Sequence, residues 1–217
     1  MNINEKIWKG NKKLGARQYF IDSYRKHLNM SSLPKDSQYW TICGQCTDAY
    51  GKPNQESEFG QILDEGLILP NQFNGIDINP DIIVSNKKAY SEANWHCGDF
   101  YQILYKESGK KDFNPAIVNA DLLFMPNKAS SYVVSLMSVL SYCHGRVMLV
   151  ANMILKYQNI KNRNSNIEYF REQFNKVHGV SSILKIANWT LPTECYVYNG
   201  TGEDSRTKLG TIIFWKE

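Results

Sequence analysis

The stretch "GIDINP", residues 75–80, places one acid, Asp77, between two isoleucines of a short apolar run. The run is too short for a helix, and alternation of this kind is typical of a β-strand. Pro80 suits the first turn of a helix, where its missing N–H costs no hydrogen bond. The stretch therefore predicts a strand over 71–78 that ends at an acid and leads directly into a helix over 81–93.

The same order of elements repeats on both sides of this stretch. Apolar segments predict six further strands, at 39–44, 94–100, 115–124, 145–155, 194–200 and 209–217. Amphipathic patterns predict further helices at 16–29, 58–66, 129–143 and 166–177. Alternating strands and helices indicate βαβ units, hence a parallel sheet with helices on both faces. The last two strands flank the turn segment "TGEDSRTK", which is a β-hairpin signal.

These patterns define the fold class that we expect. It is an α/β, doubly wound, mostly parallel seven-stranded sheet with a C-terminal antiparallel hairpin and an N-terminal helical extension. We expect residues 1–37 to form that extension and residues 38–217 to form one Rossmann-like domain.

Length and composition narrow the classes of protein. The chain has 217 residues, 42% hydrophobic and 12% aromatic, and a net charge of +4, which indicates a globular domain rather than a disordered chain. No apolar run approaches the ~20 residues needed to cross a bilayer, so we expect no membrane partner. The first residues lack the apolar core of a signal peptide, and five scattered cysteines do not suggest a disulfide framework. We therefore expect a cytoplasmic protein.

Small or polar residues stand near the ends of the first four strands of the expected sheet: Gly44, Asp77, Asp99, and the pair Asn119 and Asp121. Ligands of open parallel sheets bind outside the carboxyl ends of the strands. A glycine there lets a ligand approach the backbone, and an acid on the next strand can accept both ribose hydroxyls. The alternatives are a turn acid at 77, a helix-capping acid at 99 and backbone-satisfied polar groups at 119 and 121.

These residues resemble the motifs of class I S-adenosylmethionine-dependent methyltransferases, over roughly residues 38–217. By this resemblance "TICG" puts Gly44 beside the methionine part of S-adenosylmethionine, and "GIDINP" puts Asp77 on the ribose and Ile78 against the adenine. "GDF" puts Asp99 on the adenine amino group and Phe100 beside the ring. "NADLLFMP" puts Asn119 and Asp121 near the reactive methyl group and the acceptor.

The chain also departs from that family. Gly44 is the one glycine of the first motif, the segment from it to Asp77 is longer than usual, and the Pro-Pro-aromatic signature of amino-methylating nucleic-acid enzymes is missing. A catalytically inactive, methyltransferase-like binding or assembly module is therefore the alternative. A nicotinamide-dependent oxidoreductase is disfavoured because no GxGxxG follows the first strand.

Cys43 and Cys46 form a CxxC, which can bind zinc or exchange disulfides. Neighbouring Cys-His pairs occur at 96–97 and 143–144, but the second pair precedes a strand and falls at the opposite edge of the sheet. We therefore expect no metal site. Thiol chemistry would require a lowered pKa at one of the two cysteines.

A nucleic acid is the partner that the basic residues favour slightly. Seven lysines and arginines lie within the first thirty residues, and Lys156, Tyr157, Lys161 and Arg163 follow the strand at 145–155. Interleaved basic and aromatic residues suit the binding of single-stranded nucleic acid, although an ordinary solvated surface carries the same pattern. The sequence predicts neither the oligomeric state nor the methyl acceptor.

Overall fold

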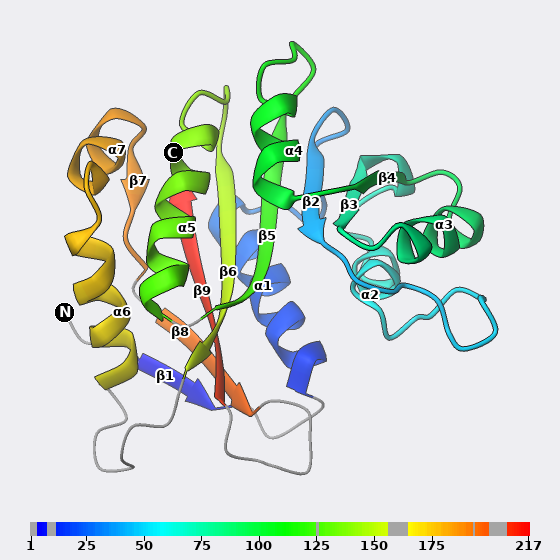
Figure 1. Ribbon diagram of the computed structural model, residues 1–217, viewed down its shortest axis with the longest axis horizontal. Helices are drawn as coiled ribbons and strands as arrows, with labels where there is room; N and C mark the ends of the chain where they lie inside the picture. The colour runs from blue at the N-terminus through cyan, green and yellow to red at the C-terminus, as the bar shows by residue number, and fades with distance from the viewer. Residues whose placement is uncertain (1–3, 8–11, 125, 156–164, 193, 200–207) are drawn as a thin grey trace.

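The computed structural model describes residues 4–7, 12–124, 126–155, 165–192, 194–199 and 208–217. One mixed sheet runs through the molecule, with α4 and α5 in front of it and α1 behind it (Figure 1). The strands are β1 (Asn4–Ile7), β2 (Gln38–Ile42), β3 (Phe73–Asp77), β4 (Asn94–Cys97), β5 (Pro115–Phe124), β6 (Val147–Leu155), β7 (Trp189–Thr190), β8 (Glu194–Asn199) and β9 (Lys208–Lys216). The α-helices are α1 (Lys12–Leu28), α2 (Glu58–Asp64), α3 (Pro80–Ala89), α4 (Phe100–Glu107), α5 (Pro126–Leu140), α6 (Ser165–Lys176) and α7 (Val180–Ile186).

The strand order is β1-β8-β9-β6-β5-β2-β3-β4, with β7 beside β9. The five strands from β4 to β6 in this order are parallel. β9 is antiparallel to both β6 and β8, which confirms the C-terminal hairpin as an arrangement of strands. The turn segment between them, residues 200–207, lies outside the described residues. The chain reverses its direction of sheet growth between β2 and β5, so a topological switch point lies there.

The sheet of the described residues has nine strands rather than seven. The seven expected strands are present, and β1 and β7 are added at one side. β1 pairs in parallel with β8, and the two-residue β7 pairs with β9. Neither segment is long enough to show a period of two, which is why the sequence pattern did not indicate them.

The "GIDINP" stretch folds as its residues indicate. β3 ends at Asp77, and the side chain of Asn79 caps α3 by accepting a bond from the N–H of Asp81. Gly75 is required by its neighbours, because a Cβ there would lie 2.6 Å from the Trp95 ring and 2.7 Å from the Phe73 ring. Pro80 occupies the first turn of α3.

Two hydrophobic cores lie on opposite faces of the sheet, as the alternation of side chains along each strand requires. Trp40, Val118 and Leu149 belong to the core under α4 and α5. Tyr39, Ile117 and Met148 belong to the core on the other face, which also takes Phe20, Ile21 and Tyr24 from α1 and Phe59 and Ile62 from α2. The helix α1 therefore packs into the same core as the sheet. The expected division into an extension, residues 1–37, and a domain, residues 38–217, stays a prediction.

Candidate active site

The predicted site residues lie along one edge of the sheet, where the parallel strands end. Asp77 of β3 is in register with Cys97 of β4, and Asp121 of β5 is in register with Asn152 of β6. Asn119, two residues before Asp121 on β5, is in register with Thr41 of β2. The structure therefore brings side chains from five consecutive strands to a common edge, on both sides of the switch point.

Asp77 is half-buried at the end of β3 and is held by its own turn. Its Oδ1 accepts a bond of 2.8 Å from the backbone N–H of Asn79. Its carbonyl accepts a bond of 3.0 Å from the N–H of Gly98, which fixes the end of β4 beside it. Asp77 is thus a turn acid, as the alternative interpretation expected. The turn uses only Oδ1 of its carboxylate, which stays at the end of β3.

Gly44 follows β2 with a φ of +57°, a conformation that favours glycine, and a Cβ there would meet no atom within 4 Å. The buried side chain of Asn86, on α3, fastens this loop. It donates to the carbonyl of Gly44 and accepts from the N–H of Cys46, both at 2.8 Å. A side-chain clamp therefore fixes the loop that follows β2.

The two residues expected at the adenine differ in exposure. Ile78 is 77% exposed directly after Asp77, which leaves an apolar side chain open at the rim. Phe100 is 4% exposed and packs in the core under α4 and α5. Its contact with a cofactor ring stays a prediction.

Asp99 is exposed and caps α4, accepting a bond of 2.9 Å from the N–H of Gln102. The capping alternative is thus present in the structure. Like Asp77, this acid uses one oxygen for a local bond at the end of its strand, and its role toward a cofactor stays a prediction.

A chain of buried polar side chains runs under the same edge, between α2 and β9. Glu58 Oε1 accepts from the Tyr39 hydroxyl at 2.6 Å and from Asn119 Nδ2 at 3.0 Å. Asn119 Oδ1 accepts from Asn152 Nδ2 at 3.1 Å, and Asn152 Oδ1 accepts from the Thr211 hydroxyl. Each of these five residues is at most 9% exposed. Asn119 is therefore positioned by side chains on both sides, not by backbone groups alone.

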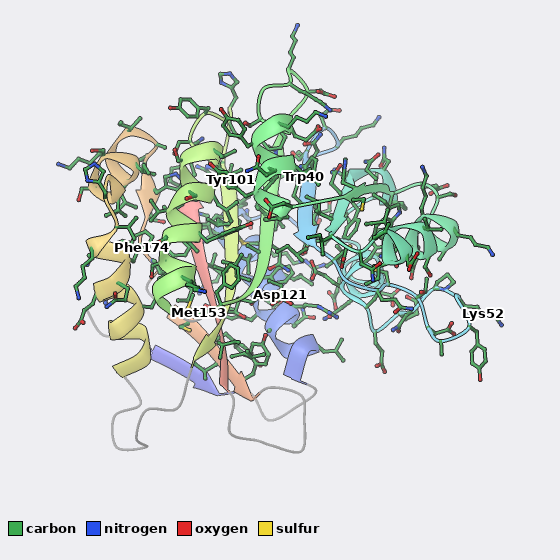
Figure 2. All side chains as sticks on the ribbon, in the orientation of Figure 1. Trp40, Lys52, Tyr101, Asp121, Met153 and Phe174 are labelled. Atoms are coloured by element: carbon green, nitrogen blue, oxygen red, sulfur yellow. The ribbon has the colours of Figure 1, made fainter. Side chains whose placement is uncertain are left out.

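A small cavity of about 20 Å³, which we call the α1 cavity, opens above this chain. Ala16 and Phe20 of α1 cover it, and its polar lining consists of Arg17, Glu58, Asn119, Asp121, Asn152 and Tyr198. Figure 2 shows the labelled Asp121 beside α1, from which Arg17 also reaches the cavity. The structure thus brings both predicted catalytic residues, Asn119 and Asp121, into one cavity.

Tyr198, which lines this cavity, and Tyr39, which bonds to Glu58, have raised pKa values. The pKa of Tyr198 is raised above its usual value, first by burial and then by the charge of Asp121, whereas Arg17 acts to lower it. Burial and the Glu58 carboxylate raise the pKa of Tyr39 well above its usual value. Both phenols are therefore neutral hydrogen-bonding groups at physiological pH.

The CxxC does not meet the requirement for thiol exchange at its first cysteine. Hydrogen bonding with Cys46 and burial raise the pKa of the Cys43 thiol far above its usual value, where a reactive thiol needs a lowered one. Among the described residues, no three His, Cys, Asp or Glu side chains are arranged to hold a metal ion.

Sequence reasoning missed Glu58 and Asn86. Glu58 has the pattern of an ordinary acid in the first turn of a helix, and Asn86 that of a polar helix residue. Their roles depend on contacts with residues between 19 and 61 positions away in the sequence, as in the Tyr39 and Asn119 bonds of Glu58.

The basic residues that favoured nucleic acid are only partly described. Arg17 donates to the carbonyl of Glu56 at 2.8 Å, and Arg25 pairs with Glu65 at 2.9 Å. The cluster at 156–163 lies outside the described residues. No helix in the described part of the chain combines the length and apolarity needed to cross a membrane.

No protein-family model matches the sequence, and a search of curated proteins gives no match. Solved structures do match. The plantazolicin methyltransferase BamL, in complex with a triazolic desmethylPZN analog and SAH, is 14% identical over 94% of this chain and 85% of its own, with a TM-score of 0.51. The N-methyltransferase NodS from Bradyrhizobium japonicum WM9 is 13% identical over 92% of this chain and 96% of its own, with a TM-score of 0.44.

A TehB-like SAM-dependent methyltransferase from Corynebacterium glutamicum is 12% identical, covers 94% of this chain and 99% of its own, and has a TM-score of 0.41. At these identities the similarity concerns the fold. The chain has the Rossmann-like fold of class I SAM-dependent methyltransferases, which confirms the expected fold class.

Proposed function

We propose that this protein is an S-adenosylmethionine-dependent methyltransferase that binds its cofactor across the carboxyl ends of β2, β3 and β4. The observation that carries the proposal is the position of Asp77. It ends β3, one strand away from the switch point, and the open backbone of Gly44 follows the neighbouring strand, β2. An acid at the end of β3, such as Asp77, can accept bonds from both hydroxyls of a ribose.

The residues present fit such a cofactor. Asp77 would take the ribose, the exposed Ile78 the adenine face and Asp99 the adenine amino group, with Phe100 behind the ring. Gly44 would let the amino-acid end approach the backbone, since no Cβ occupies that space. The bound cofactor supplies an activated methyl group on sulfur. The protein then orients an acceptor at Asn119 and Asp121 and excludes water from it.

Calorimetric titration with S-adenosylmethionine and with NADH tests the proposal. We expect S-adenosylmethionine alone to bind, and Asp77→Ala to weaken binding about tenfold or more, as loss of a charge-assisted hydrogen bond predicts. Asp81→Ala is the matched control, because Asp81 is an exposed acid in the first turn of α3. Binding of NADH, or of neither ligand, would overturn the proposal.

Absence of cofactor binding would favour the second candidate, an inactive methyltransferase-like module. The Asn86 clamp motivates it, because the clamp uses the Gly44 carbonyl and the Cys46 N–H. A nucleic-acid acceptor also stays a proposal, supported by the basic residues of the sequence and not by a described surface.

A further inference from the structure

The lining of the α1 cavity carries more negative than positive charge. Its lining contains two carboxylates, Glu58 and Asp121, against one guanidinium, that of Arg17. One of the five N–H donors of Arg17, at Nη1, bonds to the carbonyl of Glu56, which is not part of this lining. Carboxylates accept only, and both bonds received by Glu58 from Tyr39 and Asn119 go to one oxygen, Oε1. The lining therefore suits a group that donates hydrogen bonds and carries positive charge.

The burial of Glu58 gives the same indication. Glu58 is 7% exposed, and an ionised carboxylate so far from water is costly unless donors surround it. Its two partners, Tyr39 and Asn119, are neutral groups. A cationic donor in the cavity would stabilise this carboxylate more than a neutral one, because charge-assisted bonds are about twice as strong.

A buried hydroxyl nearby has no partner within the described part of the chain. Thr41 Oγ1 is fully buried and makes no hydrogen bond to any described residue. Thr41 is in register with Asn119, and its side chain lies on the same face of the sheet as those of Tyr39 and Asn119. Thr41 is thus next to Asn119 in the sheet, and a buried hydroxyl without a partner is a second sign that a polar ligand binds near the buried chain.

The cavity also limits the size of what enters. A volume of about 20 Å³ holds a group about the size of one water molecule. An amino group has this size, whereas a carboxylate is larger and would be repelled by Glu58 and Asp121. Because Ala16 and Phe20 of α1 line one side of the cavity, we expect the rest of an acceptor to extend away from α1.

We propose that the α1 cavity binds the amino group of the methyl acceptor, with Glu58 and Asp121 as the carboxylates that receive it, so that the substrate class is an amine. The cavity's role as an acceptor site rests on the proposed methyltransferase function. Asn119 and Asn152 are positioning residues, because they hold the Glu58 carboxylate and connect it to β9.

The reaction that follows is balanced. The ammonium form binds and gives one proton to solvent through Asp121, which leaves a neutral nitrogen with its lone pair. That nitrogen forms a bond to the sulfonium methyl carbon as the carbon–sulfur bond breaks, and the bonding pair stays on sulfur as a thioether. The product is the N-methylammonium ion, which carries the positive charge that the sulfonium loses.

Methylammonium, methanol and formate are the probes that test the cavity, because they differ in charge at similar size. Each is titrated into isotope-labelled protein without cofactor, and the side-chain amide signals of Asn119 and Asn152 are followed by NMR. The Asn86 amide is the internal control, since Asn86 belongs to the loop clamp and not to the cavity. We expect methylammonium alone to shift the two cavity amides.

The variants Glu58→Gln and Asp121→Asn keep side-chain size and remove one charge each. We expect each to weaken methylammonium binding about tenfold, whereas the exposed control Glu92→Gln leaves it unchanged. A urea unfolding curve shows which variants are folded, and Asp121→Asn serves if Glu58→Gln is not. Preference for methanol or formate, absence of any shift, or unchanged affinity in both variants would overturn the proposal.

Labelled S-adenosylmethionine with a matched amine, alcohol and carboxylic acid of one carbon skeleton then tests the acceptor class. Methyl transfer to the amine alone is expected, and transfer to the alcohol or the acid would contradict the proposal. If S-adenosylmethionine does not bind at all, the methyltransferase function fails. The NMR titration still decides amine recognition, because it uses no cofactor.

Discussion

Asn119 Nδ2 lies 3.0 Å from Glu58 Oε1, across 61 positions of sequence, and this bond joins the middle of β5 to the first turn of α2. The two residues belong to elements on either side of the switch point. The bond therefore links α2, which follows β2 in the chain, to β5 across that point.

Replacing Asn119 by leucine tests how much this coupling stabilises the fold. The change removes a donor from buried Glu58 and leaves the Asn152 amide without its acceptor. Since each unsatisfied buried group costs about 1–3 kcal/mol, we expect a loss of roughly 3 kcal/mol in the free energy of unfolding, measured in urea. Asn175→Leu, at an exposed position of α6, is the control, and an equal loss in both variants would contradict the role of the buried chain.

Asn86→Ala tests the clamp on the loop after β2. Without it the Cys46 N–H and the Gly44 carbonyl lose their partner, which should cost about 2 kcal/mol of stability. We also expect the dissociation constant for S-adenosylmethionine to rise about tenfold, because binding must then order the loop. The comparison is with Lys87→Ala, an exposed neighbour on α3. An unchanged affinity would separate the clamp from cofactor binding.

Tyr24→Phe should stabilise the protein. The Tyr24 hydroxyl is buried and bonds to no described residue, so its removal should raise the free energy of unfolding by about 1 kcal/mol. Burial raises the pKa of Tyr24 to about 12, above its unfolded value of 10.0. Between these two values the phenol is ionised in the unfolded chain and neutral in the folded protein. The free energy of unfolding therefore has its full value below pH 10 and falls as the pH rises toward 12. Chemical denaturation at pH 8 and pH 11 should show a smaller loss in the variant, and an unchanged loss would refute the assignment. Tyr105→Phe, at an exposed site, should change neither value.

His96 should make stability fall at mildly acidic pH. Burial lowers its pKa from 6.5, and Lys110 acts in the same direction while Glu107 opposes them. Its stacking partner, Trp40, lies with its ring centroid 5.1 Å away. A lowered folded-state pKa gives stability that is present above pH 6.5 and is lost as the pH falls through the folded value.

Unfolding curves at pH 7.5 and pH 5 measure this effect. We expect His96→Gln to lower stability at both values and to reduce the difference between them. The exposed His178→Gln variant should keep the wild-type difference. If His96→Gln keeps it as well, the pH dependence arises from other groups.

Much of the fold was predictable because its strands are locally distinct. The runs at 115–124 and 145–155 are mostly apolar, interrupted by Asn119, Asp121 and Asn152, and they form β5 and β6 within two residues of the expected bounds. The strand expected at 94–100 ends at Cys97, because Gly98 takes a φ of +148° and Asp99 caps the next helix. Local sequence thus indicated the elements and left their last residues open.

The site was less predictable than the fold. Asp77 and Gly44 stand where strands end, so position alone indicated them. Glu58 and Asn86 lie on helices, and only the packing of α2 and α3 against the sheet gives their side chains partners. A single sequence contains no signal for such contacts, since their geometry depends on elements that are distant along the chain.

The place of β9 between β6 and β8 also has a consequence for synthesis on the ribosome. β6 pairs with β9 along nine residues, from Val147 to Leu155, and β9 is made after every other strand described here. Until then, a growing chain has no partner for one edge of its most apolar strand. Such an edge invites pairing with other chains, so nascent copies on one messenger RNA are most prone to aggregate in that interval.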